Sequence, residues 1–240
     1  MANLEYLLWA YFIFYPVYGY FTHEKDKQRI NTQPHLKLAL YRTTMLHIWL
    51  PTILVLAMLA GNALSPSDIG LTWQWLWPNT LGIALAIMIV AYFIFAFVQL
   101  NNSSDARQTL SKQMAHVGWF MPTTKKESRY FIFGVAISAG ICEELLFRGF
   151  LLHSLGQSLP IYAAVIISSV AFGLGHIYQG WGNVVKTSVI GAVMALIFLL
   201  TDSIIVPILL HVIVDMFGGI MGYKVYSGQP SINTENRQIG

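Results

Sequence analysis

The chain has few charged residues for its length. Of its 240 residues, 10% are Asp, Glu, Lys or Arg, whereas soluble domains average about 25%. A chain this poor in charge lacks the polar side chains that a water-exposed surface requires, and 55% of its residues are hydrophobic. These proportions exclude intrinsic disorder. The formal net charge of +3 is small and forms no basic stripe, which excludes nucleic-acid binding.

Cysteine and strand-like patterning are scarce as well. The single cysteine, Cys142, permits no internal disulfide, so a secreted disulfide scaffold is excluded. Polar and apolar residues do not alternate with a period of two over any useful length, which argues against a membrane β-barrel. The sequence also contains no repeat and no low-complexity tract. We therefore expect an all-α, polytopic membrane protein.

Long apolar runs are abundant instead. A membrane-spanning helix needs about 20 mostly apolar residues. Runs of this kind predict a bundle of about seven transmembrane helices, at residues 3–21, 41–60, 79–100, 130–154, 160–178, 184–200 and 204–222. The first run has neither the basic residues nor the cleavage site of a signal peptide, so we expect it to be retained.

Lys and Arg alternate between the connections of this bundle. The segment after the first run is basic, residues 61–78 contain no Lys or Arg, and residues 102–129 are basic again. Because cytoplasmic loops are enriched in Lys and Arg, seven helices with the amino terminus outside and the carboxyl terminus in the cytoplasm satisfy every loop. Residues 102–120 mix charged and apolar side chains, which predicts an amphipathic helix on the cytoplasmic face.

The fourth run contains three ionisable residues in its middle: Glu143, Glu144 and Arg148. Each charge at the centre of a spanning helix costs about 2.5–3.5 kcal/mol on insertion scales, so these side chains need partners or a wet cavity. Glu144 and Arg148 are one helical turn apart and are expected to pair. Glu143 points about 100° away from Glu144, so Arg148 cannot easily neutralise both carboxylates and Glu143 needs another partner or role.

Two later runs carry further ionisable residues at one-turn spacing. Phe172 and His176 share a face of the fifth run, and His211 and Asp215 share a face of the seventh. These residues either lock helices together as buried ion pairs or converge with Glu143 on one polar pocket. The presence of such a set on three helices favours the functional pocket.

The motifs Glu143-Glu144-x-x-x-Arg148, Phe172-x-x-x-His176 and His211-x-x-x-Asp215 resemble the three signatures of the CPBP family. These intramembrane proteases include the type II CAAX prenyl endopeptidases and the bacteriocin-processing and abortive-infection proteins. The resemblance implies one integral-membrane domain with three parts. Residues 1–120 would form N-terminal helices and interfacial segments, residues 121–225 the catalytic bundle, and residues 226–240 a cytoplasmic tail.

The resemblance implies an intramembrane endopeptidase of glutamate or metallo type, with its catalytic residues on the fourth, fifth and seventh helices. Glu143 and His176 would activate water, and His211 and Asp215 would stabilise the oxyanion. An ionised Asp215 cannot donate a hydrogen bond. Asp215 either stays protonated in an apolar site and donates one, or it accepts one from His211, fixes the tautomer of that ring and keeps it cationic. The one-turn spacing of the two residues favours the second alternative. The supporting residues would be Glu144, Arg148 and Phe172.

No cofactor is expected to be required. The alternative is a Zn²⁺ site formed by Glu143, His176 and His211, with Asp215 behind His211, although the sequence contains no H-E-x-x-H. The expected partners are the lipid bilayer and a CAAX-type, leader-type or bacteriocin-type peptide or a membrane-protein substrate, without nucleic acid. The oligomeric state is open, and the resemblance favours the bacterial inner membrane.

Two other functions compete with the peptidase. A non-catalytic bacteriocin-immunity or peptide-binding membrane protein would keep the same fold without turnover. A transporter would use the charges as an ion path. It is less favoured because the paired broken helices and inverted repeats typical of transporters are absent from the sequence.

The alternating loop charges predict a topology that reporter tags can measure. A tag at residue 26 or 240 is expected to report the cytoplasm, and a tag at residue 68 the opposite side, because basic loops are retained in the cytoplasm. Tags at residues 68 and 126 that report the same side would contradict the seven-helix arrangement.

Overall fold

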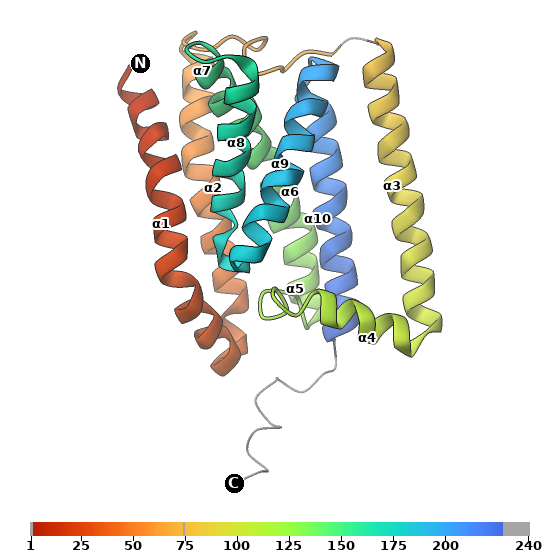
Figure 1. The fold of residues 1–240 in the computed structure, drawn as a ribbon. Helices are drawn as coiled ribbons and strands as arrows, with labels where there is room; N and C mark the ends of the chain where they lie inside the picture. Colours follow the sequence, from red (N-terminus) through yellow and green to blue (C-terminus); the bar gives the residue numbers. More distant parts are fainter. Residues whose placement is uncertain (1, 74, 228–240) are drawn as a thin grey trace.

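The computed structural model describes residues 2–73 and 75–227, and within them every regular element is a helix (Figure 1). The longer elements are α1 (Ala2–Thr32), α2 (Lys37–Ala60), α3 (Trp77–Asn102), α8 (Ile161–Gly175), α9 (Trp181–Thr201) and α10 (Ile205–Tyr226). The shorter ones are η1 (Pro34–Leu36), α4 (Ser104–Gln113) and η4 (Ile177–Gln179). The expected tail begins at residue 226, which is the last residue of α10. Its residues 228–240, with the tag position at residue 240, lie outside the described residues.

One further long helix, residues 125–156, is built from five consecutive pieces. These are α5 (Lys125–Tyr130), η2 (Phe131–Ala136), α6 (Ile137–Glu144), η3 (Leu145–Leu152) and α7 (His153–Gly156). The pieces η2 and η3 are π-helical. Wide π turns are frequently found at functional sites of helices, and here they flank the piece that carries Glu143 and Glu144.

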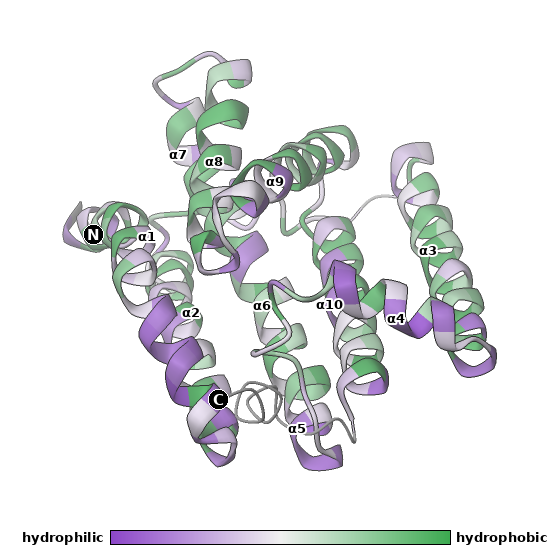
Figure 2. Cartoon of the chain, turned by 60° about the horizontal axis from the view of Figure 1, so that its bottom comes forward, coloured by the Kyte–Doolittle hydropathy of each residue, from purple (hydrophilic) through white to green (hydrophobic). Residues whose placement is uncertain are grey.

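Five helices in the described residues are long and apolar enough to cross a membrane: Pro34–Ala60, Trp77–Asn102, Lys125–Gly156, Trp181–Thr201 and Ile205–Tyr226. The chain is therefore an integral membrane protein. The helix α8 is apolar but has 15 residues, about 22 Å, which is shorter than the roughly 30 Å hydrocarbon core. The second half of α1 is charged (Figure 2). The count of seven transmembrane helices stays a prediction.

The ends of the bundle carry different segments. Figure 1 places the α1–α2 turn, α4 and α5 at one end and residues 61–73 at the other, so basic and base-free segments are separated as the loop charges predict. The amphipathic helix expected over residues 102–120 is present as α4 and ends at Gln113. Beyond it the chain forms turns, and Phe120 packs with Tyr41, Phe131 and Tyr226 in a hydrophobic cluster. The helix therefore does not continue to residue 120, because the chain turns inward to bury Phe120 in this cluster.

A buried polar latch joins the start of α2 to the segment that precedes α5. Lys37 is 4% exposed, and its Nζ donates a hydrogen bond to the Met121 carbonyl at 2.8 Å and lies 3.9 Å from Glu127 Oε2. Tyr41 donates its hydroxyl hydrogen to the Phe120 carbonyl at 2.7 Å. Because Phe120 and Met121 also line a cavity of about 520 Å³, the latch fixes one wall of that cavity.

Replacing Lys37 with Met should lower the free energy of unfolding by about 3 kcal/mol, because it leaves the buried Glu127 without its cation. The exposed Lys126 on the same helix end is the matched control, and Lys126→Met should change stability by less than about 0.5 kcal/mol. Both are measured as unfolding transitions of purified protein in detergent. Equal effects of the two substitutions would contradict the latch.

Candidate active site

The two adjacent glutamates are held where α6 passes very close to α10. A Cβ added at Gly140 would lie 2.4 Å from Val212 Cγ2 and 2.8 Å from the Val212 backbone nitrogen, so only glycine permits this approach. Gly140 precedes Glu144 by one helical turn, and Val212 adjoins His211. The close crossing therefore brings the carboxylate of Glu144 to the imidazole of His211.

Glu144 lies at the centre of a buried charge network. The side chain is 0% exposed, and its Oε1 accepts hydrogen bonds from Arg148 Nη1 at 2.9 Å and from His211 Nδ1 at 2.7 Å. The predicted Glu144–Arg148 pair is confirmed. The carboxylate that orients the His211 ring is thus Glu144.

Arg148 ties this network to the α8–α9 side of the bundle. It is 2% exposed, donates from Nη2 to the Gly191 carbonyl on α9 at 3.1 Å, and lies with its guanidinium carbon 4.4 Å from the centre of the Phe172 ring. Buried guanidinium groups interact favourably with aromatic faces. Phe172 also contacts both histidines, with ring centres 4.7 Å from His176 and 6.1 Å from His211. The supporting role expected of Phe172 therefore has a physical basis.

His176 is positioned by the end of a helix. The helix α8 ends at Gly175, where glycine residues weaken helical continuation. The next residue, His176, hydrogen bonds through Nδ1 to the Phe172 carbonyl at 2.9 Å, one of the carbonyls that a helix end leaves free. A carbonyl only accepts, so Nδ1 carries the hydrogen and Nε2 of the neutral ring has its lone pair free.

Glu143 faces these two imidazoles, as expected from its helical angle to Glu144. Its Oε2 lies 3.7 Å from His176 Nε2 and 4.0 Å from His211 Nε2. Among the described residues this buried oxygen has no hydrogen-bond partner. A buried carboxylate oxygen without a partner is costly for stability. Glu144 Oε2 also has no partner within residues 2–73 and 75–227, but Glu143 is the one of the two glutamates that lines the cavity described below, where a water molecule or a substrate can reach it.

Asp215 lies at the edge of the site. Its Oδ2 is 3.6 Å from His211 Nε2, and its side chain is 36% exposed. The expectation that Asp215 fixes the tautomer of His211 is wrong in this structure, because Glu144 holds Nδ1 at 2.7 Å while the Asp215 contact is beyond hydrogen-bonding distance. Asp215 is close enough to interact electrostatically with the ring.

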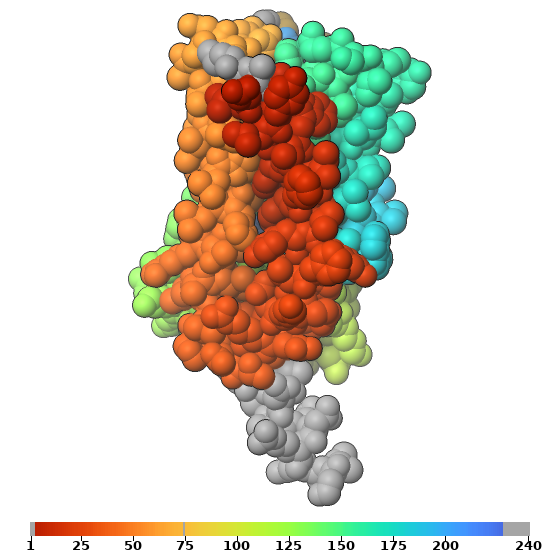
Figure 3. Space-filling view, turned by 90° about the vertical axis from the view of Figure 1, so that its left-hand side faces the viewer, coloured from red at the N-terminus to blue at the C-terminus, as the bar shows by residue number. Residues whose placement is uncertain are grey.

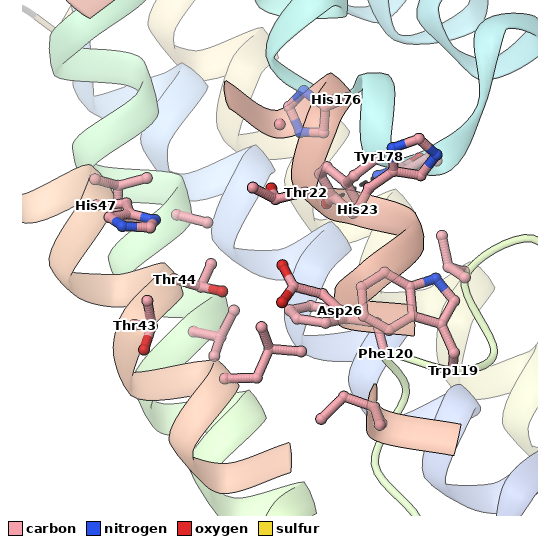
Figure 4. Close-up of a pocket in the computed structure, with 18 of the residues that line it drawn as sticks. Thr22, His23, Asp26, Thr43, Thr44, His47, Trp119, Phe120, His176 and Tyr178 are labelled. Atoms are coloured by element: carbon pink, nitrogen blue, oxygen red, sulfur yellow. Dashed lines mark hydrogen bonds between the residues drawn. The ribbon is translucent and has the colours of Figure 1, made fainter. Parts of the chain in front are cut away.

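A cavity of about 520 Å³ opens beside these residues and is lined by Glu143, His176 and Asp215. Most of the remaining wall comes from α1, α2 and the turns after α4, with polar side chains such as Asp26 (Figure 4). Figure 3 shows a narrow hollow between α1 and α2 on the face that these helices form. Sequence motifs drew no attention to Tyr178, which also lines the cavity. The only signal for it is its position two residues after His176.

The side chains expected to hold Zn²⁺ in the alternative mechanism are Glu143, His176 and His211. Within residues 2–73 and 75–227, no group of three or more His, Cys, Asp or Glu side chains is arranged to hold a metal ion. Two ligands of one tetrahedral zinc ion are about 3.4 Å apart. The Glu143 oxygen lies 3.7 and 4.0 Å from the nearest nitrogens of His176 and His211. The steps below are therefore derived from side chains alone.

Residues 125–217 match a family model described as type II CAAX prenyl endopeptidase Rce1-like. This part of the chain is similar to that family. The match includes all three motifs and supports a CPBP-family intramembrane protease, in agreement with the resemblance of the sequence. It covers less than half of the chain and leaves α1, α2, α3 and α4 outside. No curated protein and no solved structure matches the chain.

The hydrogen bonds of Glu144 with Arg148 and His211 predict that Glu144 is primarily structural. Glu144→Gln should reduce the free energy of unfolding by about 3–5 kcal/mol, because it leaves Arg148 buried without a counter-charge. Activity should fall as well, since His211 loses its anchor. The matched control is Glu24→Gln, which breaks the exposed Glu24–Lys27 pair and should cost less than about 1 kcal/mol.

Thermal and chemical unfolding in detergent measure both changes. A Glu144→Gln protein that is as stable as the wild type would show that the Arg148 network does not hold these helices together.

Proposed function

We propose that the chain is an intramembrane endopeptidase that hydrolyses a peptide bond with water activated by Glu143 and His176. The observation that carries this proposal is the buried, partnerless Glu143 Oε2, which lies 3.7 Å from His176 Nε2 on the wall of a polar cavity. One water molecule can hydrogen bond to both atoms at this separation. Both atoms accept, so together they orient the two hydrogens of the water and direct its lone pairs outward.

Hydrolysis then follows from the charges of the site. Glu143 removes a proton from the water as the oxygen attacks the peptide carbonyl carbon, and the carbonyl oxygen becomes negative. The C–N bond breaks when the amine receives that proton from Glu143, leaving a carboxylic acid and an amine. His211 with Asp215 would stabilise the charged intermediate. Glu144, Arg148 and Phe172 would support these groups without contacting the substrate.

The surroundings favour this chemistry. Fixed dipoles and charges act more strongly in a site of low dielectric than in water. The two histidines are held by Phe172 and Glu144 through Nδ1, so their Nε2 atoms are oriented before a substrate binds. We propose catalysis without a cofactor, and a Zn²⁺-dependent reaction is the alternative that a chelator tests.

The substrate we propose is a CAAX-type or leader-type peptide, or a segment of a membrane protein, that enters from the basic end of the bundle. The charged half of α1 contributes His23 and Asp26 to the cavity wall at that end. We place that end in the cytoplasm, with the amino terminus outside, in a bacterial inner membrane. Residues 121–225 would form the catalytic bundle.

Glu143→Gln tests the proposal directly. The amide keeps the shape of the side chain and removes the base, so turnover of a cleavable peptide should fall by about 10²–10⁴-fold. Folding should be unaffected, because the Glu143 carboxylate makes no ion pair with Lys or Arg in the described residues. Cleavage is measured with purified protein in detergent, with and without a chelator.

An active Glu143→Gln protein would refute this mechanism. A wild-type protein that binds the peptides without cleaving them would favour a peptide-binding role instead. Loss of wild-type activity with chelator, restored by Zn²⁺, would favour the metal-dependent alternative.

A further inference from the structure

The site is poor in hydrogen-bond donors, although an oxyanion requires them. The Nδ1 hydrogens of His176 and His211 are directed to the Phe172 carbonyl and to Glu144. In their neutral forms both rings therefore present an accepting Nε2 to the site. Glu143 and Asp215 also only accept when they are ionised. If His211 is cationic, it supplies one donor, and preorganised sites for tetrahedral intermediates commonly use more than one.

Tyr178 is a hydroxyl donor in the wall of the same cavity. It follows His176 in η4, half-buried, with its ring centre 5.9 Å from that of His176 and 6.2 Å from that of Phe120 (Figure 4). Its oxygen accepts a hydrogen bond from Gln179 Nε2 at 3.1 Å. Among the described residues, none accepts a hydrogen bond from the Tyr178 hydroxyl in return. A phenol has an ordinary pKa near 10 and keeps its hydrogen at neutral pH.

We propose that Tyr178 donates a hydrogen bond to the oxyanion formed when water attacks the substrate carbonyl. This inference rests on the proposed peptidase function and adds a catalytic residue to it. The short η4 turn fixes Tyr178 relative to His176, because both residues belong to one run of backbone hydrogen bonds, in which Gln179 N bonds to the His176 carbonyl at 2.9 Å. His176, which orients the water, and Tyr178, which donates to the oxyanion, are thereby placed on one short segment.

The step leaves every proton accounted for. The water oxygen forms a bond to the carbonyl carbon, its proton goes to Glu143, and the carbonyl π electrons move to the oxygen that Tyr178 faces. Tyr178 keeps its proton and strengthens its hydrogen bond as the charge grows. When the C–N bond breaks, the electrons return to form the carbonyl of the new acid, and the amine takes the proton from Glu143.

Tyr178→Phe tests the role because it removes one oxygen and keeps the ring that packs on His176 and Phe120. Loss of a single oxyanion donor lowers kcat by about 10²–10³-fold. We expect that loss in kcat with KM unchanged, because the contact forms in the transition state, and with the unfolding transition unchanged. Tyr162→Phe on the exposed face of α8, 69% exposed, is the matched control and should retain wild-type kcat.

A second variant tests the reason for the role. Asp215→Asn places an amide donor beside the site without changing the size of the side chain. In the background of Tyr178→Phe, it should restore kcat at least tenfold. Failure to restore it would overturn the inference that a missing donor causes the loss. A Tyr178→Phe enzyme with kcat within twofold of the wild type, or with a loss confined to KM, would overturn it as well.

Glu143→Gln in the same assay separates the two proposals. If Glu143→Gln is inactive and Tyr178→Phe is fully active, the peptidase function stands and the role of Tyr178 fails. If Glu143→Gln is fully active, the proposed function fails, and the role of Tyr178 fails with it.

Discussion

The arrangement of this bundle depends on one buried carboxylate, that of Glu144. A charge inside a membrane protein is tolerated only where partners compensate for the loss of water. Glu144 has two such partners on the same oxygen, Arg148 and His211, and Arg148 continues to the Gly191 carbonyl on α9 and to the ring of Phe172 on α8. These contacts fix the positions of four helices relative to one another: the long helix of residues 125–156, α8, α9 and α10. The residues of these helices that face the cavity are positioned by the same contacts.

The two adjacent glutamates, Glu143 and Glu144, have different surroundings although they lie on one helix. A rotation of about 100° separates neighbouring side chains, so Glu144 is directed into the charge network and Glu143 toward the two Nε2 atoms. The Oε2 atom of each carboxylate has no hydrogen-bond partner in the described residues, but Glu144 is held through Oε1 by Arg148 and His211, whereas Glu143 makes no ion pair with Lys or Arg there and lines the cavity. The structural role therefore falls to Glu144, and the catalytic role that we propose falls to Glu143. The π-helical pieces on both sides of α6 alter the turn spacing around this pair without interrupting the helix.

Local spacing predicted much of this site. The Glu144–Arg148 pair and the shared face of Phe172 and His176 follow from one-turn separation on a helix, and each apolar run coincides with a helical segment. Spacing along one helix favoured Asp215 as the partner of His211, but the true partner of Nδ1 is Glu144, because Gly140 allows α6 and α10 to approach closely. A tertiary contact of this kind cannot be read from the sequence pattern of either helix alone. The cavity wall from α1 was missed for the same reason, since α1 carries no motif.

Hydrolysis inside a membrane protein requires water where the bilayer excludes it, and the shortness of α8 addresses this requirement. With 15 residues, α8 ends before it could cross the hydrocarbon core, so His176 and η4 lie within the bundle at the wall of the polar cavity. The helix α1 has 31 residues, about 46 Å, and its charged half extends beyond a core of roughly 30 Å. The short α8 thus places His176 and η4 at the cavity wall, and the long α1 continues that wall with polar side chains such as Asp26.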